Sequence, residues 1–163
     1  MKTWFTYAIC LGFMGMMNAQ ASNTVMEEKL PYYPNETYFT TEVIGLGEDF
    51  ILDHWHQYVW DHGGRSEILG YEKGDFQMVS KDVRFTPLDD ETVTINMKMA
   101  PNAAETGVNL SINVKKDDGT YLSPRGQDKA MAQKLEKWLL DFNQGLTRLE
   151  KQEVFNHVIQ KGK

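Results

Sequence analysis

Three of the four histidines, His54, His56 and His62, lie close together in the sequence beside Asp53 and Asp61. Imidazole and carboxylate groups together can bind a transition metal or transfer protons, which is the chemistry of many hydrolases. A helix brings residues three or four positions apart to the same side, whereas these histidines are two, six and eight positions apart. The histidines are therefore weak metal candidates without a complete site, and a hydrolase built on this helix is an alternative function.

Other patterns that accompany catalysis are missing from the sequence. No serine lies between glycines as at a strand-to-helix nucleophile turn, and neither the phosphate-binding nor the dinucleotide-binding glycine pattern occurs. The acidic pairs at 89–90 and 117–118 fall in predicted turns, where aspartate is favoured for its hydrogen bonds to the backbone. The sequence therefore favours a non-catalytic protein, and no cofactor is expected.

Two neighbouring stretches, 92–99 and 108–114, alternate without exception between polar and apolar residues. A period of two places all the apolar side chains on one face of a strand, as in an antiparallel sheet covered on one side only. The opposite face then offers hydroxyl, amide and amino groups and no aromatic rings, which suits a polar partner or a glycan. The predicted ligand-binding residues on this face are Thr94, Asn96, Lys98, Asn109, Ser111 and Asn113.

The rest of the chain supplies further strands and two amphipathic helices that cover the apolar face. A helix over 47–62 ends at a glycine pair, and a long helix begins at 127 or 128, with a kink expected at Gly145 and its last turns outrunning the domain. The predicted strands are 37–44, 65–70, 76–86 with a bulge near 79–81, the two alternating stretches, and 120–122 after an Asp-Gly turn.

These elements predict an α+β fold: an antiparallel meander sheet of four to six strands, with one face covered by an N-terminal helix and a long C-terminal helix. The order is β-α-β-β-β-β-α. It resembles, in architecture only, modules of the cystatin-like and TATA-binding-protein-like kind, and no sequence motif of either family is present. The cystatin-like order implies one further alternative function, that of a proteinaceous inhibitor of an exported enzyme.

The start of the chain has the features of a secretory signal peptide, predicted over residues 1–21. Lys2 is followed by an apolar stretch at 4–17 and by a small-x-small motif at Ala19-Gln20-Ala21. Cys10 is the only cysteine, so cleavage would leave a protein that is held together by its core without disulfides. This combination indicates export to a bacterial periplasm or the extracellular space, with retention of the signal as an anchor as the alternative.

Two further segments follow the predicted signal peptide. Residues 22–36 contain Pro31-Tyr32-Tyr33-Pro34 and are predicted to form an extended leader segment. Residues 37–163 are predicted to form a single α+β domain with a C-terminal helix, long enough to bury a substantial core.

The formal net charge of −6, without a basic cluster in the folded region, argues against binding to nucleic acid or to anionic lipid. No transmembrane span is expected after signal cleavage. We therefore predict an exported, non-catalytic binding or assembly module of the bacterial envelope, with a protein or an envelope polysaccharide as its partner.

Overall fold

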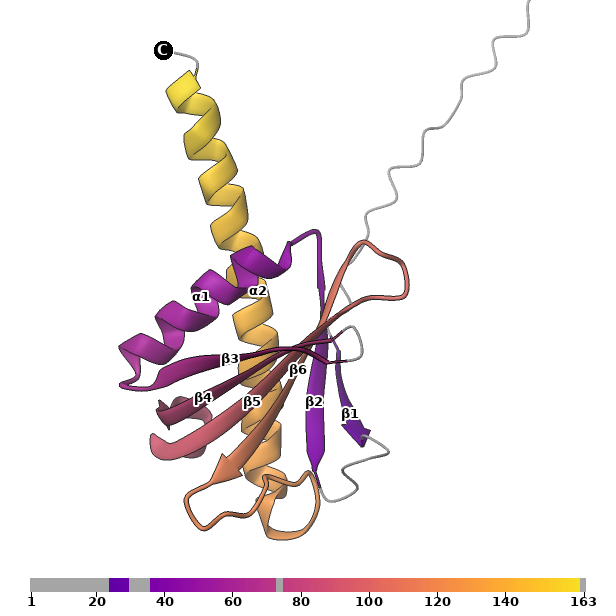
Figure 1. Cartoon of the computed structure of the whole chain (residues 1–163), viewed down its shortest axis with the longest axis vertical. Helices are drawn as coiled ribbons and strands as arrows, with labels where there is room; N and C mark the ends of the chain where they lie inside the picture. Colours follow the sequence, from indigo (N-terminus) through magenta and orange to yellow (C-terminus); the bar gives the residue numbers. More distant parts are fainter. Residues whose placement is uncertain (1–23, 30–35, 73–74, 162–163) are drawn as a thin grey trace, which may run out of the picture.

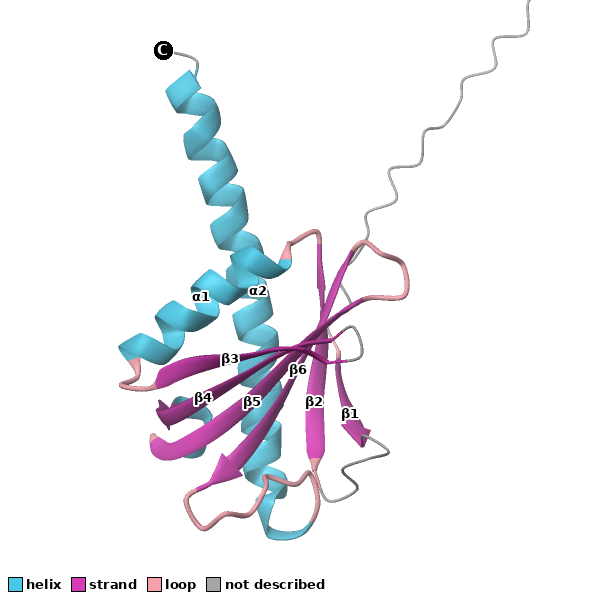
Figure 2. Ribbon diagram, in the orientation of Figure 1, coloured by secondary structure: helices cyan, strands magenta, loops and turns pink. Residues whose placement is uncertain are grey.

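The computed structural model describes residues 24–29, 36–72 and 75–161. The predicted signal peptide, Cys10, and the Pro31–Pro34 part of the leader segment lie outside the described residues. The expected fold class is confirmed: six antiparallel strands form one sheet, and a shorter and a longer helix accompany it (Figures 1 and 2).

The strands are arranged in the order β1-β2-β6-β5-β4-β3, so that β3 to β6 form the predicted meander and β2 pairs with β6. Helix α1 connects β2, next to one edge, with β3 at the other edge. The elements are β1 Val25–Lys29, β2 Thr37–Ile44, α1 Glu48–Asp61, β3 Arg65–Glu72, β4 Asp75–Phe85, β5 Glu91–Pro101, β6 Gly107–Lys116 and α2 Lys129–Lys161.

The strict alternation of β5 and β6 produces matched apolar pairs across the two strands. Met97 lies opposite Ile112 and Met99 opposite Leu110, and these four side chains are at most 1% exposed. A close approach at Gly107 helps to hold β6 beside β2, because an added Cβ there would collide with the carbonyl oxygen of Val43. Glycine is therefore required where β6 begins.

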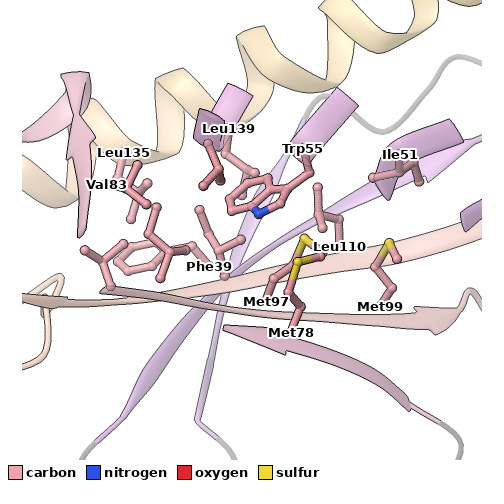
Figure 3. Close-up of a cluster of buried hydrophobic side chains, with 14 of the residues drawn as sticks. Phe39, Ile51, Trp55, Met78, Val83, Met97, Met99, Leu110, Leu135 and Leu139 are labelled. Carbon is pink, nitrogen blue, oxygen red and sulfur yellow. The ribbon is translucent and has the colours of Figure 1, made fainter. Parts of the chain in front are cut away.

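Both helices cover the apolar face of the sheet. Ile51 and Trp55 of α1 and Leu135 and Leu139 of α2 join the strand residues in one hydrophobic cluster, and each is fully buried. Figure 3 shows Trp55 above the sheet, close to Met97. The cluster holds all the fully buried large apolar side chains of the described residues, so the hydrophobic stabilisation of the fold is concentrated on this side.

Aromatic rings join the two helices to each other. The ring of Trp55 packs edge-on against Trp138 and Phe142 of α2, with centroid separations of 6.3 and 5.8 Å. The Trp55 indole N–H donates to Ser80 Oγ at 3.0 Å, and Ser80 Oγ lies 2.9 Å from Ser66 Oγ. The one polar atom of this large buried side chain is therefore satisfied by β4.

The predicted bulge in β4 is confirmed, because the register between β4 and β5 shifts between Ser80 and Val83. Asp82, inside this shift, has a φ of 59°, a left-handed conformation that aspartate adopts more readily than most residues. The strand predicted over 120–122 is wrong: only an isolated bridge joins Lys115 to Tyr121. The Asp-Gly turn forms, but the chain leaves the sheet after a single residue pair.

Strand β1 was not expected from the sequence. It lies within the predicted leader segment and pairs antiparallel with β2, from Val25 opposite Thr41 to Lys29 opposite Thr37. Val25 packs partly buried against the core cluster. The leader thus contributes an edge strand to the sheet.

Helix α2 is continuous from Lys129 to Lys161, and the chain passes through Gly145 without leaving the helix. Its first half covers the sheet, where Asn143 Nδ2 donates to the carbonyl oxygen of Glu42 at 2.9 Å. The side chains of residues 151–157, in the second half of α2, are all exposed. Figure 1 shows that this second half, here called the projecting half, extends away from the sheet, as predicted. Among the described helices, none is both long enough and apolar enough to span a membrane.

Candidate functional site on the polar face of the sheet

The side of the sheet opposite the helices, here called the polar face, carries all six residues predicted to bind a ligand. On β5 and β6, Asn96 lies opposite Asn113 and Lys98 opposite Ser111. Five of the six side chains are half-buried, and Asn113 is fully buried. The sequence pattern therefore identified one continuous surface, set by the same alternation that builds the core.

Hydrogen bonds within the sheet already engage part of the polar face. Asn96 Nδ2 donates to Asn113 Oδ1 at 3.2 Å, and Asn113 Nδ2 donates to the carbonyl oxygen of Thr37 at 3.1 Å. The hydroxyl groups of Thr40 and Ser111 lie 2.8 Å apart. Because a buried amide must be satisfied internally, Asn113 serves mainly to join β6 to β2 and β5.

A cavity of about 180 Å³ opens on the polar face, and two of the six predicted residues, Asn96 and Lys98, line it. Thr94, Asn109, Ser111 and Asn113 lie on the same face outside its lining. The cavity brings together residues from four strands and two connecting segments: Glu36, Tyr38, Leu69, Gln77, Met78, Asn96, Met97, Lys98 and Tyr121.

Aromatic rings border this cavity, although the polar residues of β5 and β6 include none. Tyr38 comes from β2, and the Lys98 ammonium lies 4.8 Å from the centre of its ring. Tyr121 comes from the segment after β6, and the Lys115 ammonium lies 5.8 Å from its ring centre. Cations at these distances are attracted to the faces of aromatic rings. The lysines and tyrosines are therefore held as pairs.

The surroundings of Tyr121 oppose the loss of its hydroxyl proton. Partial burial raises the pKa of Tyr121, and the charge of Glu36 and a hydrogen bond to it act in the same direction. The hydroxyl is therefore a neutral group next to a carboxylate. Amide, ammonium, carboxylate and phenol groups thus surround the opening, and the lining also includes Met78 and Met97, which belong to the core cluster.

Sequence reasoning could have found Tyr38, because alternation along β2 places it on the side opposite Phe39 and Val43. Tyr121 and Leu69 carried no such signal. Tyr121 reaches the face through the path of the segment after β6, and Leu69 lies at a register shift between Ile68 and Gly70.

The histidines of α1 do not converge. His54 Nδ1 lies 2.8 Å from the carbonyl oxygen of Phe50, and His62 Nδ1 lies 2.7 Å from that of Tyr58, each in its own helical turn. His56 is exposed and lines a separate cavity at the edge of the sheet. Within the described ranges, no three histidine, cysteine or acidic side chains gather closely enough to hold a metal ion.

Fold and site together define an α+β domain in which helices cover one side of a sheet and the other side carries a small polar cavity with aromatic walls. Comparison with known protein families, with characterised proteins and with solved structures finds no significant match.

Proposed function

We propose that this protein is an exported, non-catalytic binding module of the bacterial envelope, and that its polar face binds an envelope polysaccharide. The observation that carries the proposal is the cavity on the polar face, which joins the predicted residues Asn96 and Lys98 to Tyr38 and Tyr121. Its features are those that ligand sites share: a concave surface, apolar wall atoms and a few convergent polar groups.

The lining chemistry suits a sugar. Sugar hydroxyl groups both donate and accept hydrogen bonds, and the lining offers amides on Asn96 and Gln77, an ammonium on Lys98 and a carboxylate on Glu36. The apolar face of a sugar ring can pack against the half-buried ring of Tyr121, which combines a large apolar body with a polar tip, whereas Tyr38 is 4% exposed. The same lining therefore offers both kinds of contact that a saccharide uses.

The size of the cavity limits what it can accept. About 180 Å³ is below the range of roughly 300–1,000 Å³ that is usual for sites of drug-sized ligands. A bulky cofactor does not fit, whereas one sugar ring at the end or side of a longer chain does. The remainder of a polysaccharide would then extend along the polar face over Thr94 and Asn109.

The test is binding to an array of purified bacterial polysaccharides by the wild-type protein and by the single variants Asn96→Ala and Tyr121→Ala. Thr92→Ala is the matched control, because Thr92 lies on β5 with the same orientation as Asn96 but outside the cavity lining. Loss of one good contact should weaken binding by about tenfold, equivalent to about 1.4 kcal/mol. Thr92→Ala should bind as the wild type does.

Two results would contradict the proposal. One is the absence of any polysaccharide bound by the wild-type protein, which would leave a protein partner as the alternative ligand. The other is equal binding by Asn96→Ala, Tyr121→Ala and the wild type, which would place the ligand elsewhere. Thermal unfolding of each variant checks that the fold is retained.

A further inference from the structure

The outer edge of β3 carries a concentration of exposed apolar side chains. Ile68, Leu69 and Tyr71 of β3 are 57, 59 and 68% exposed, and Trp60, near the end of α1, is 77% exposed. Strand β3 ends the sheet, and no strand among the described residues pairs with its outer side. Large exposed apolar groups beside unpaired backbone amides favour pairing with another strand.

The opposite edge of the sheet is better protected. Strand β1 has five residues, of which Glu27, Glu28 and Lys29 are charged. Short length and charged side chains are two ways in which proteins prevent strands from associating at an edge. Strand β3 also carries three charged residues, but it is eight residues long and exposes Ile68, Leu69 and Tyr71 among them. The two edges therefore differ in how readily they would accept a further strand.

A cavity of about 260 Å³ lies where β3 begins, between α1 and the strand. It is lined by His56, Val59, Trp60, Gly64, Arg65 and Ser66. Gly64 packs closely against β4, because an added Cβ would lie 2.7 Å from Val83 Cγ2 and 2.9 Å from the carbonyl oxygen of Lys81. The cavity thus lies beside the first residues of the edge strand β3.

We propose that β3 pairs antiparallel with β3 of a second copy of this chain, about a two-fold axis at Ser66. In an antiparallel pair, residues directly opposite each other have side chains on the same face. An axis at Ser66 places Arg65 opposite Glu67 of the second copy, and Ile68 opposite Gly64 of the second copy. The exposed Ile68 side chain of each copy then enters the cavity beside Gly64 of the other.

Charge selects this register among the possible ones. A two-fold axis at Arg65 would place two guanidinium groups opposite each other, and an axis at Glu67 would do the same with two carboxylates, both of which are destabilising. An axis at Ile68 would carry the pairing through the register shift between Ile68 and Gly70. Among axes from Arg65 to Ile68, the one at Ser66 places opposite charges across from each other and avoids the register shift, over a short paired segment from Gly64 to Ile68.

Arg65 and Glu67 already form ion pairs within their own chain, and these do not prevent pairing with a second copy. Arg65 contacts Asp82 at 2.8 Å and Glu67 contacts Lys81 at 3.1 Å, and all four side chains are about half or more exposed. Ion pairs this exposed contribute little to stability, so the side chains can be shared with a second copy.

The area available predicts a weak dimer rather than a permanent one. Trp60 and Ile68 together offer on the order of 300 Å² of exposed side chain per copy. With the paired backbone added, the interface is still smaller than the roughly 800 Å² per partner that a stable complex buries. Association should therefore depend on concentration in the measurable range.

Sedimentation velocity over a series of concentrations tests the proposal, with protein purified after export of the full-length sequence and its chain mass fixed by mass spectrometry. The wild type should pass from monomer to dimer as concentration rises. Ile68→Lys should remain monomeric, because lysine at a strand edge opposes pairing. Val154→Lys is the matched control, since Val154 is 55% exposed on the projecting half of α2, and it should dimerise as the wild type does.

Charge exchange tests the register. Arg65→Glu and Glu67→Arg should each weaken the dimer at least severalfold, and the double variant should recover it, because the pairs are restored with reversed sign. A wild type that is monomeric at every soluble concentration would overturn the proposal. So would a dimer unaffected by Ile68→Lys, a dimer abolished by Val154→Lys, or a double variant weaker than both single ones.

Discussion

Replacement of Ser80 by alanine tests how the two layers of the fold are joined. Trp55 and Ser80 are both 0% exposed, and the indole N–H donates to Ser80 Oγ at 3.0 Å. Ser80→Ala removes the acceptor while the buried donor stays in place, without access to water. A buried polar group left unpaired costs about 1–3 kcal/mol, so we expect the free energy of unfolding to fall by that amount.

Ser66 makes a separate and smaller contribution. Its hydroxyl lies 2.9 Å from Ser80 Oγ, but Ser66 is only half-buried and near the sheet edge, where water can replace a lost partner. Ser66→Ala should therefore cost at most about 1 kcal/mol, the net value of an ordinary hydrogen bond. Because Ser66→Ala leaves the Trp55–Ser80 bond intact, it is the matched control.

Urea unfolding followed by far-ultraviolet circular dichroism measures both variants, and Trp55→Phe completes a double-mutant cycle. When the indole N–H is absent, Ser80→Ala should cost less, with a coupling energy of about 0.5–3 kcal/mol between the two positions. A coupling energy near zero would show that Trp55 and Ser80 are not bonded in solution. The placement of α1 against β4 would then be wrong.

Two further predictions concern the covered side of the sheet. Tyr58 Oη is buried and makes no well-aligned hydrogen bond among the described residues, so Tyr58→Phe should be neutral or stabilising by up to about 1 kcal/mol in urea unfolding. Burial raises the pKa of Tyr58 to about 12 in the folded protein, whereas in the unfolded chain this hydroxyl loses its proton near pH 10. Between pH 10 and 12 the unfolded state is therefore favoured, and the wild type should lose more stability than Tyr58→Phe. Mild peroxide should oxidise Met26, which is 57% exposed, much faster than Met97 or Met99, which are 1 and 0% exposed, as measured by peptide mass spectrometry. Equal rates would mean that the helices do not cover the apolar face of the sheet.

The parts of the fold that were predictable from sequence are those in which burial and backbone geometry impose the same pattern. From Val93 to Met99, every second residue is apolar, and each of these residues is at most 2% exposed. Helix α1 was equally clear, because Ile51, Trp55 and Val59 recur at helical spacing and all three are buried. Such patterns are strict because the helices cover only one face of the sheet. A shift of one residue in strand register would expose every apolar side chain of the strand.

The missed elements depend on long-range pairing. Strand β1, Val25–Lys29, has no strict alternation, and it is ordered by pairing with β2 rather than by its own pattern. The pairing of β2 with β6 joins residues about seventy positions apart, such as Phe39 and Ile112, and no local signal specifies it. The strand predicted over 120–122 is wrong although its local signal is strong: the Asp-Gly turn forms, but the chain leaves the sheet after it.

The candidate site was predictable in part for the same reason. Asn96 and Lys98 were found because β5 alternates strictly. Tyr121 and Leu69 were not, because their positions follow from a connecting segment and from a strand irregularity. A concave site of this kind is formed by residues from several strands. The sequence predicts such residues only in strands that alternate regularly between polar and apolar positions.

The proposed ligand-binding surface is the polar face of the sheet, opposite the two helices. The most direct test is a nuclear magnetic resonance titration of uniformly ¹⁵N-labelled protein with a soluble fragment of the polysaccharide that binds best on the array. The largest amide shifts should fall at Tyr38, Asn96, Lys98 and Tyr121. Shifts that gather instead on α1 or on the projecting half of α2, with these four amides unchanged, would contradict the proposal.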